Sequence, residues 1–141
     1  MPETDPVTDP DQLAKAWTAA WNSHDLDRIL DLYADDCEMS SPKIAAFGKA
    51  AGGSLRGKAN LREYWATALR RQPNLHFELG RVFASPDSVV LAYTDHRGHV
   101  VCEFLRYGDD GRIIQGAAHH AVAAASTTGT ERPARERADS L

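Results

Sequence analysis

The chain has 141 residues, of which 43% are hydrophobic and 26% are charged, a composition typical of one globular domain and too short a chain for two. With 16 basic and 20 acidic residues its formal charge is -4, so it offers no net positive field to nucleic acid. It has neither an apolar run long enough to span a membrane nor the basic start and apolar stretch of a secretory signal, which predicts a cytoplasmic protein.

The two ends of the chain differ in composition from its middle. Residues 1–8 combine prolines and acids with almost no apolar side chains, and residues 126–141 are polar with one glycine and one proline. Such segments bury too little apolar surface to offset the entropy lost on ordering. We therefore predict one domain over residues 9–125 between two disordered tails.

Three stretches in the first half carry apolar residues at helical spacing, namely residues 13–21, 26–33 and 61–69. Asp9 and Asp25 precede the first two stretches and are typical N-cap residues. Pro73 follows the third and cannot continue a helix. Each predicted helix has one apolar face, which another layer must cover.

After Pro73 the pattern changes to the alternation typical of strands, in residues 75–79, 88–96, 100–107 and 112–122. Short turns at Arg97-Gly98 and at residues 108–111 predict hairpins between the last three. Helices followed by antiparallel strands predict an α+β fold, with three N-terminal helices packed on a strongly curved antiparallel sheet.

Three motifs occur in a fixed order: LYADD at residues 32–36, LRGK at 55–58 before a helix with Tyr64-Trp65, and GDDGRI at 108–113. Their order resembles the nuclear transport factor 2-like superfamily, in particular its SnoaL-like and ketosteroid-isomerase-like branches. The resemblance implies a cone in which helices and sheet enclose an apolar pocket. Members include isomerases, polyketide cyclases, dehydratases and proteins without a known reaction, so the fold does not fix the function.

The resemblance also places the isomerase's functional positions on this chain. Its general-base aspartate corresponds to Ser41, which cannot act as a base unaided, and its oxyanion-hole tyrosine corresponds to Trp17, which keeps an N–H donor. Its oxyanion-hole carboxylic acid corresponds to Glu103, and an aromatic pocket residue is replaced by His120. The resemblance therefore implies a retained acid without the steroid-isomerising base.

Turn lengths predict which strand residues oppose one another. Counting across a four-residue turn at 108–111 places Glu103 opposite Gly116 and His99 opposite His120. Alternate residues share one face of a strand, so these side chains would line the same wall. That wall holds a single acid among small residues, as a pocket would.

A two-residue loop at Arg97-Gly98 likewise predicts the outer face of the sheet. It puts Tyr93, Cys102 and Phe104 on the side opposite Glu103. An apolar outer face of this kind is usually covered. We therefore expect a homodimer through the outer sheet face, as the resemblance also implies.

The candidate catalytic residues are Glu103, His120 and His99, because a carboxyl group in an apolar pocket becomes a neutral donor and imidazole moves protons near neutral pH. The candidate substrate-binding residues come from the predicted helices, strands and lid: Trp17, Tyr33, Ser41, Phe47, Tyr64, Trp65, Val101 and Leu105. No zinc-ligand spacing occurs, and we predict neither a metal nor a cofactor.

Residues 41–53 are the predicted lid of the pocket, because small residues and glycines give this segment little packing. Phe47 would then plug an apolar mouth.

Each candidate has a structural alternative: Glu103 could face solvent or pair with Arg81 or Arg106, and the histidines could lie at a rim. The sequence favours a pocket protein that binds a small apolar molecule bearing a carbonyl or hydroxyl group. It would perform cofactor-independent acid–base chemistry of the isomerase, cyclase or dehydratase class. The alternative is a non-catalytic ligand-binding or accessory module with the same fold.

Overall fold

The structure is a computed structural model that describes residues 9–47 and 53–122, and the side chains of residues 45–47 are not among those described. The helices are α1 (Pro10–Ser23), α2 (Leu26–Leu30), α3 (Pro42–Phe47) and α4 (Lys58–Arg71). The strands are β1 (Tyr33–Ser40), β2 (Ser54–Arg56), β3 (Glu78–Ser85), β4 (Ser88–Thr94), β5 (Val100–Tyr107) and β6 (Ile113–His120). Both predicted tails lie outside the described residues.

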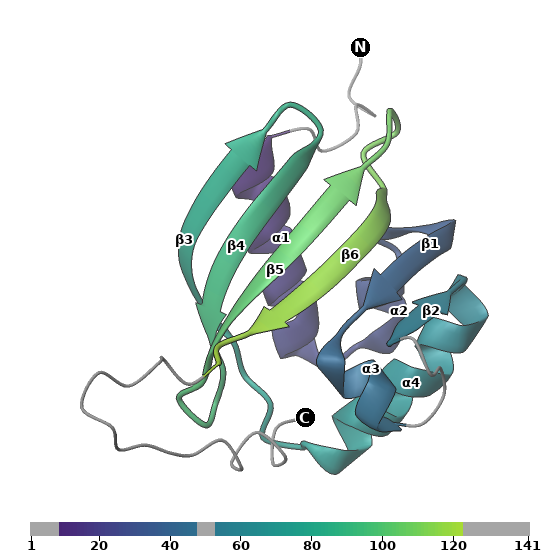
Figure 1. Ribbon diagram of the computed structural model, residues 1–141, viewed down its shortest axis with the longest axis vertical. Coiled ribbons are helices and arrows are strands. Elements are labelled where there is room, and N and C mark those ends of the chain that lie inside the picture. The colour runs from purple at the N-terminus through teal and green to yellow at the C-terminus, as the bar shows by residue number, and fades with distance from the viewer. Residues whose placement is uncertain (1–8, 48–52, 123–141) are drawn as a thin grey trace.

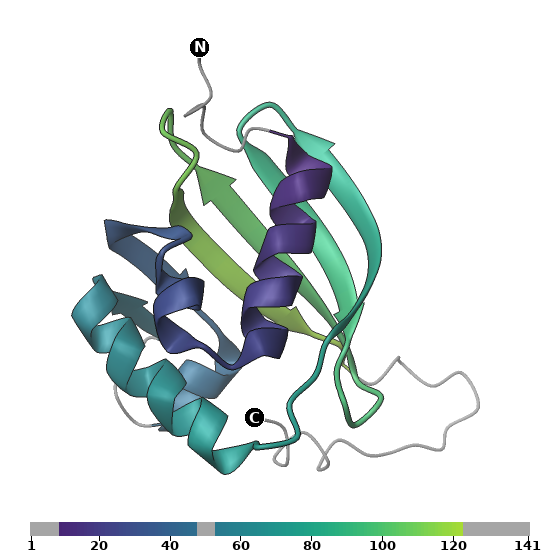
Figure 2. The ribbon, with the colours of Figure 1, turned by 180° about the vertical axis from the view of Figure 1, so that it is seen from behind.

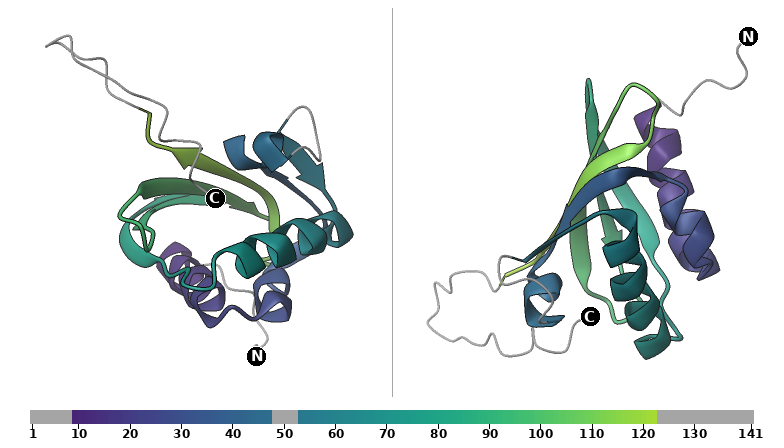
Figure 3. Two further views of the ribbon diagram at one scale, coloured as in Figure 1. Left: turned by 90° about the horizontal axis from the view of Figure 1, so that it is seen from below. Right: turned by 90° about the vertical axis from the view of Figure 1, so that its right-hand side faces the viewer.

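The six strands form one sheet in the order β2-β1-β6-β5-β4-β3 (Figure 1). The sheet is strongly curved, α1 crosses its concave face, and α4 runs along one end (Figures 2 and 3). This confirms the α+β fold with helices packed on a curved sheet. The sheet is mixed, because β1 and β6 are parallel and the other pairs antiparallel. None of the helices in the described ranges could cross a membrane.

The helix boundaries follow the capping residues read from the sequence. The Asp9 side chain accepts a hydrogen bond from the backbone N–H of Asp11, and the Asp25 side chain does the same for Asp27 and Arg28. The second helix is shorter than predicted, since α2 ends at Leu30 and Asp31 and Leu32 form a turn. Tyr33 therefore begins β1 instead of extending a helix.

The segment before β3 alternates in burial as predicted, but it does not pair as a strand. The Asn22 side chain takes the place of a neighbouring strand: Phe77 N–H donates to its Oδ1 at 2.7 Å, and its Nδ2 donates to Phe77 O at 2.9 Å. A ring nitrogen of His24 lies 2.8 Å from Leu75 O. The end of α1 therefore holds the buried side chains of Leu75 and Phe77 inward, and strand pairing begins only at Glu78.

The turn between β4 and β5 corrects the predicted register. It is a three-residue loop, because Asp95 N–H donates to His99 O at 2.8 Å. The Asp95 Oδ1 accepts the backbone N–H groups of Arg97 and His99, each at 2.9 Å, which fixes this longer turn. The pairing slips by one residue, so Glu103 lies opposite Leu91.

This slip exchanges the two faces of β4. Tyr93, predicted to lie on the outer face, is 7% exposed and packs inside, with its ring centroid 4.2 Å from Phe77 and 5.4 Å from Trp17. The prediction for Tyr93 was therefore wrong. Cys102 is exposed and Phe104 is half-buried, as expected for residues that alternate with the buried face of β5.

The turn between β5 and β6 also differs from the prediction but preserves the face. A loop closed by Gly108 N–H on Arg112 O, 2.9 Å apart, shifts the pairing by one residue, and a bulge near the turn shifts it by a second. Glu103 lies opposite Ala118 instead of Gly116. Because two one-residue shifts restore the alternation, Glu103 and His120 still point to the same side.

Candidate functional site

The helices and the concave face of the sheet enclose a cavity. The volume of this cavity that is open to the centres of water molecules is about 110 Å³. One bound water needs only a fraction of that volume. Its wall is built by Trp17, Trp21, Tyr33, Met39, Ser41, Lys43, Ile44, Tyr64, Trp65, Ala68, Gln72, Leu75, Phe77, Tyr93, Asp95, Val101, Glu103, Ala118 and His120.

Aromatic rings form most of the inner wall. Trp17 and Trp21 lie one helical turn apart on the buried stripe of α1, and Trp21 meets Trp65 of α4 edge-on with centroids 5.2 Å apart. Phe77 stacks on Trp17 at 5.7 Å. These flat apolar surfaces favour a planar apolar ligand, because stacked and edge-on rings gain energy beyond simple burial.

Glu103 is the acid of the inner wall. Its position on β5 alternates with exposed residues, and only 2% of its surface is exposed. Its Oε2 is buried and has no hydrogen-bond partner among the described residues. Burial raises the pKa of Glu103 to about 8, so at neutral pH the carboxyl group is protonated and can donate a hydrogen bond. The structure thus shows neither the solvent-facing nor the arginine-paired alternative for this residue.

Two further donors lie in the same wall. The indole N–H of Trp17 donates to the hydroxyl oxygen of Tyr33 at 3.0 Å, so Trp17 is already engaged, while the Tyr33 hydroxyl keeps its own proton to donate. Burial, followed by the charge that Glu103 would carry when ionised, raises the pKa of Tyr33 well above its usual range. The indole nitrogen of Trp21 is buried without a partner among the described residues.

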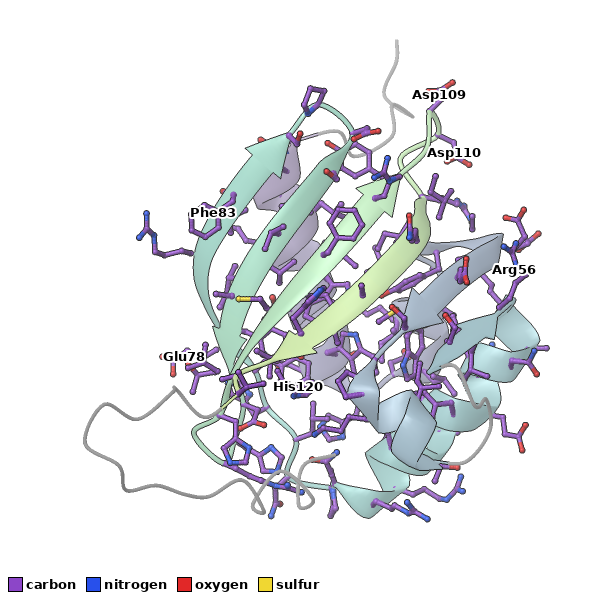
Figure 4. The ribbon with its side chains drawn as sticks, in the orientation of Figure 1. Arg56, Glu78, Phe83, Asp109, Asp110 and His120 are labelled. Carbon is purple, nitrogen blue, oxygen red and sulfur yellow. The ribbon has the colours of Figure 1, made fainter. Side chains whose placement is uncertain are left out.

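The other end of the cavity is polar and partly open to solvent. Lys43 of α3, Gln72 at the end of α4, Asp95 of the β4–β5 turn and His120 of β6 all line it and are half-buried. His120 marks the place in Figure 4, at the end of the sheet opposite the β5–β6 turn. We call these four residues the mouth.

His120 is an uncharged base at this mouth. Burial, then the positive charge of Lys43, lowers the pKa of His120 to about 4, so at neutral pH the imidazole is free to accept a proton. It lies opposite Val101, and Glu103 lies opposite Ala118. Glu103 and His120 are therefore diagonal neighbours on one face of the sheet, a relation in which residues lie about 7 to 8 Å apart.

Six of the predicted substrate-binding residues line the cavity together with Glu103 and His120: Trp17, Tyr33, Ser41, Tyr64, Trp65 and Val101. Leu105 is fully buried but belongs to the core beneath the cavity, where it meets Gly116. His99 is not among the residues that line the cavity; it lies beside the β4–β5 turn, with its Nδ1 3.7 Å from Asp95 Oδ2. The side chain of Phe47 and part of the predicted lid lie outside the described residues.

Several wall residues were not predicted from the sequence, for identifiable reasons. Trp21 shares the α1 stripe with Trp17, and that spacing was a usable signal. Tyr93 was assigned to the wrong face by the register slip. Lys43 belongs to the short helix α3, which the sequence pattern did not predict. In the described ranges no group of three or more His, Cys, Asp or Glu side chains is arranged to hold a metal ion.

Known proteins resemble this chain in both sequence and structure. The sequence profile described as SnoaL-like domain matches residues 14–124. A SnoaL-like protein of unknown function from Burkholderia thailandensis is 42% identical, with a TM-score of 0.77, over 83% of this chain and 99% of that one. Among curated proteins no sequence matches the chain.

Two less similar structures share the fold. TerC, crystallised with polyporic acid, is 18% identical with a TM-score of 0.66, over 79% of this chain and 91% of its own. IdmH from Streptomyces antibioticus, assigned as a candidate polyketide cyclase, is 20% identical with a TM-score of 0.66, over 78% and 90%.

Proposed function

Because the chain belongs to the SnoaL-like domain family, we propose that it binds a flat, apolar compound with a carbonyl or hydroxyl group and acts on it by acid–base chemistry without a cofactor. The observation that carries this proposal is the buried Glu103, whose Oε2 has no partner among the described residues and lies in an aromatic cavity. A buried polar group without a partner costs free energy. A ligand oxygen in the cavity would supply that partner.

The proposed reaction begins with a carbonyl oxygen placed against the inner donors. Neutral Glu103 and the Tyr33 hydroxyl donate to that oxygen, on which negative charge develops. A C–H bond next to the carbonyl breaks, its electron pair forms the enol, and its proton passes to His120. Return of the proton to the same or another carbon completes an exchange or an isomerisation, with no oxidant or reductant consumed.

The low pKa of His120 limits the substrates that can react. A base with a pKa of about 4 removes a proton efficiently only from an activated C–H bond, for example one flanked by a carbonyl group and an aromatic ring or by two carbonyl groups. The proposed substrates are therefore acidic carbon compounds, in keeping with the isomerase, cyclase and dehydratase classes.

Hydrogen–deuterium exchange on 2-tetralone tests this proposal. This bicyclic ketone has an activated C–H between its carbonyl and its ring, and NMR in heavy water follows the exchange. We expect the protein to accelerate it, and Glu103→Ala to reduce the acceleration roughly 100-fold to 1000-fold, as loss of an oxyanion donor does. Glu103→Gln keeps a donor and should lose less. Exposed Glu78, at the start of β3 and outside the cavity wall, gives the matched control Glu78→Gln.

A non-catalytic binding module is the second candidate function. The position of Asp95 favours this function. Asp95 carries the second carboxylate of the wall, but its own turn holds that carboxylate, so it is not placed to act as a strong base. Two results together would support this alternative. 2-Tetralone would quench the tryptophan emission of the protein, which shows binding, and the hydrogen–deuterium exchange of 2-tetralone would be no faster with protein than in buffer alone.

We also propose that the protein is a cytoplasmic homodimer joined through the outer sheet face. That face carries Phe83 and Val100, which are 50% and 52% exposed, together with Ile114 and Phe104, and Cys102 is an exposed free thiol suited to a reducing compartment. Sedimentation at micromolar concentration should show a dimer. Phe83→Asp should dissociate it, whereas Val122→Asp, beyond the end of β6, should not; a wild-type monomer contradicts the proposal.

A further inference from the structure

The mouth of the cavity contains a cation that has no close partner within the described part of the chain. Lys43 is half-buried and lines the cavity from α3. Across residues 9–47 and 53–122 its ammonium group forms no hydrogen bond or ion pair; its charge interacts at longer range with those of Arg97 and Asp95 and with the ring of His120. A half-buried ammonium without a close counterion is costly, because it has lost water without gaining an anion.

The nearby carboxylate does not supply that counterion, because its own turn holds it. Asp95 Oδ1 accepts two backbone N–H groups, from Arg97 and His99, and Asp95 Oδ2 lies 3.7 Å from the Nδ1 of His99. These contacts fix the carboxylate to the β4–β5 turn. Lys43 therefore remains available to a ligand.

The neighbourhood of Lys43 favours an anion over a neutral group. Burial, then the positive charge of Arg97, lowers the pKa of Lys43 to about 8, and Asp95 opposes that change. At neutral pH the side chain is therefore mostly protonated, and the guanidinium of Arg97 adds a second positive charge nearby. Glu103 and His120 are uncharged at this pH, so neither repels an anion.

We propose that the ligand of this cavity is an organic acid whose anionic oxygen, a carboxylate or an acidic enol, pairs with Lys43 at the mouth. Its apolar body then lies among the aromatic rings, and its carbonyl oxygen reaches Glu103. This inference rests on the proposed function, since it assumes that the cavity binds a flat carbonyl compound. It adds the charge of the ligand and the residue that recognises it.

Two matched quinones test the inference. The first, 2-hydroxy-1,4-naphthoquinone, is an acidic enol that is anionic at neutral pH, and 2-methoxy-1,4-naphthoquinone is its neutral counterpart. The chain has three tryptophans, and all of them line the cavity, so quenching of tryptophan emission reports occupancy. We expect the hydroxyquinone to bind roughly 10-fold to 100-fold more tightly, as a charge-assisted hydrogen bond allows.

Variants of Lys43 identify the source of this preference. Lys43→Met should abolish it by weakening only the binding of the hydroxyquinone, and Lys43→Arg should keep it. Lys15→Met, on the exposed side of α1 where Lys15 pairs with Asp11, is the matched control and should change neither affinity. Repeating the titrations with Cys102→Ser excludes addition of the exposed thiol to the quinones.

The outcomes separate this inference from the proposed function. If both quinones bind the unmodified chain equally, or if Lys43→Met keeps the preference, the anion site is wrong and the apolar pocket stands. If neither quinone binds while 2-tetralone does, the anion site is also wrong. If none of the three compounds binds, the proposed function fails and this inference fails with it.

Discussion

The inner wall and the mouth of the cavity place their ionisable side chains in different surroundings. At the inner wall, Glu103 is surrounded by aromatic rings and is neutral because it is buried. At the mouth, Lys43 is only half-buried and is mostly protonated at neutral pH, because the pKa of its ammonium group is about 8. The depth of a side chain, more than its type, therefore decides whether it can donate a proton or attract a charge.

His120 belongs to both regions and shows where they meet. It shares a face with Glu103 but lies at the open end of β6 (Figure 4). Burial and the charge of Lys43 both lower its pKa, so the mouth tunes the base while the inner wall tunes the acid. Changes at the two ends should therefore have opposite pH signatures.

The largest expected effect concerns the stability of the inner wall against pH. The pKa of Glu103 is about 8 in the folded chain and about 4.3 when unfolded, so the folded state binds the extra proton. The free energy of unfolding should therefore be highest below about pH 4 and fall as pH rises toward 8, by at most on the order of 1.4 kcal/mol per pH unit. A glutamine side chain does not titrate, so the free energy of unfolding of Glu103→Gln should change less with pH.

Urea unfolding of the wild type and of Glu103→Gln, at several pH values, measures the effect as a difference of free energies. Glu78→Gln at the exposed start of β3 serves as control. If the difference between Glu103→Gln and wild type stays constant from about pH 5 to about pH 8, the neutral inner acid is wrong.

Tyr33→Phe removes the hydroxyl group that is the second donor of the inner wall. It leaves the buried indole N–H of Trp17 without its acceptor, which should cost about 1 to 3 kcal/mol of stability. It also removes a hydroxyl from the proposed oxyanion site, so 2-tetralone exchange should slow further. Thermal unfolding and the exchange assay measure the two effects separately; unchanged exchange would leave Tyr33 with a structural role only.

The sequence predicted the layers of this fold better than the details of its turns. Periodic apolar stripes and the caps at Asp9 and Asp25 located the helices, because burial and capping are local signals. The parallel contact between β1 and β6 was not predicted. It joins residues about eighty positions apart, and no local pattern encodes such a pairing.

The candidate site depended on those turns. Glu103 kept its face because two one-residue shifts in the β5–β6 hairpin cancel, whereas Tyr93 changed sides because the β4–β5 hairpin has a single shift. The signal that could have prevented this error is Asp95 followed by Gly98: a side chain that caps a turn, and a glycine whose φ of 88° suits a three-residue loop.

Asp95→Ala tests that explanation at the mouth. It removes the side-chain acceptor of two backbone N–H groups, which should cost about 1 kcal/mol of stability. Asp87→Ala, in the exposed turn between β3 and β4 where Asp87 meets Arg106, should cost less. In Asp95→Ala, the hydrogen exchange of backbone amides in β4 and β5, measured by NMR, should be faster only near the β4–β5 turn. Equal losses of stability in Asp95→Ala and Asp87→Ala would contradict the capping role.

The smallest expected effect has the opposite pH sign and belongs to His120. Its folded pKa of about 4 lies below the unfolded value of about 6.5, so the unfolded chain binds the extra proton. Stability should fall as pH decreases from about 6.5 to about 4, by less than about 1 kcal/mol because the ring is only half-buried and solvent screens it.

The charges of Lys43, Asp95, His99 and His119 act on the same ring. His120→Gln cannot take up this proton, so its free energy of unfolding relative to wild type should rise on the acid side, while His76→Gln, at an exposed position before β3, serves as control. If His120→Gln instead becomes relatively less stable as the pH falls through that range, the ring is charged in the folded state and cannot be the base of the proposed reaction.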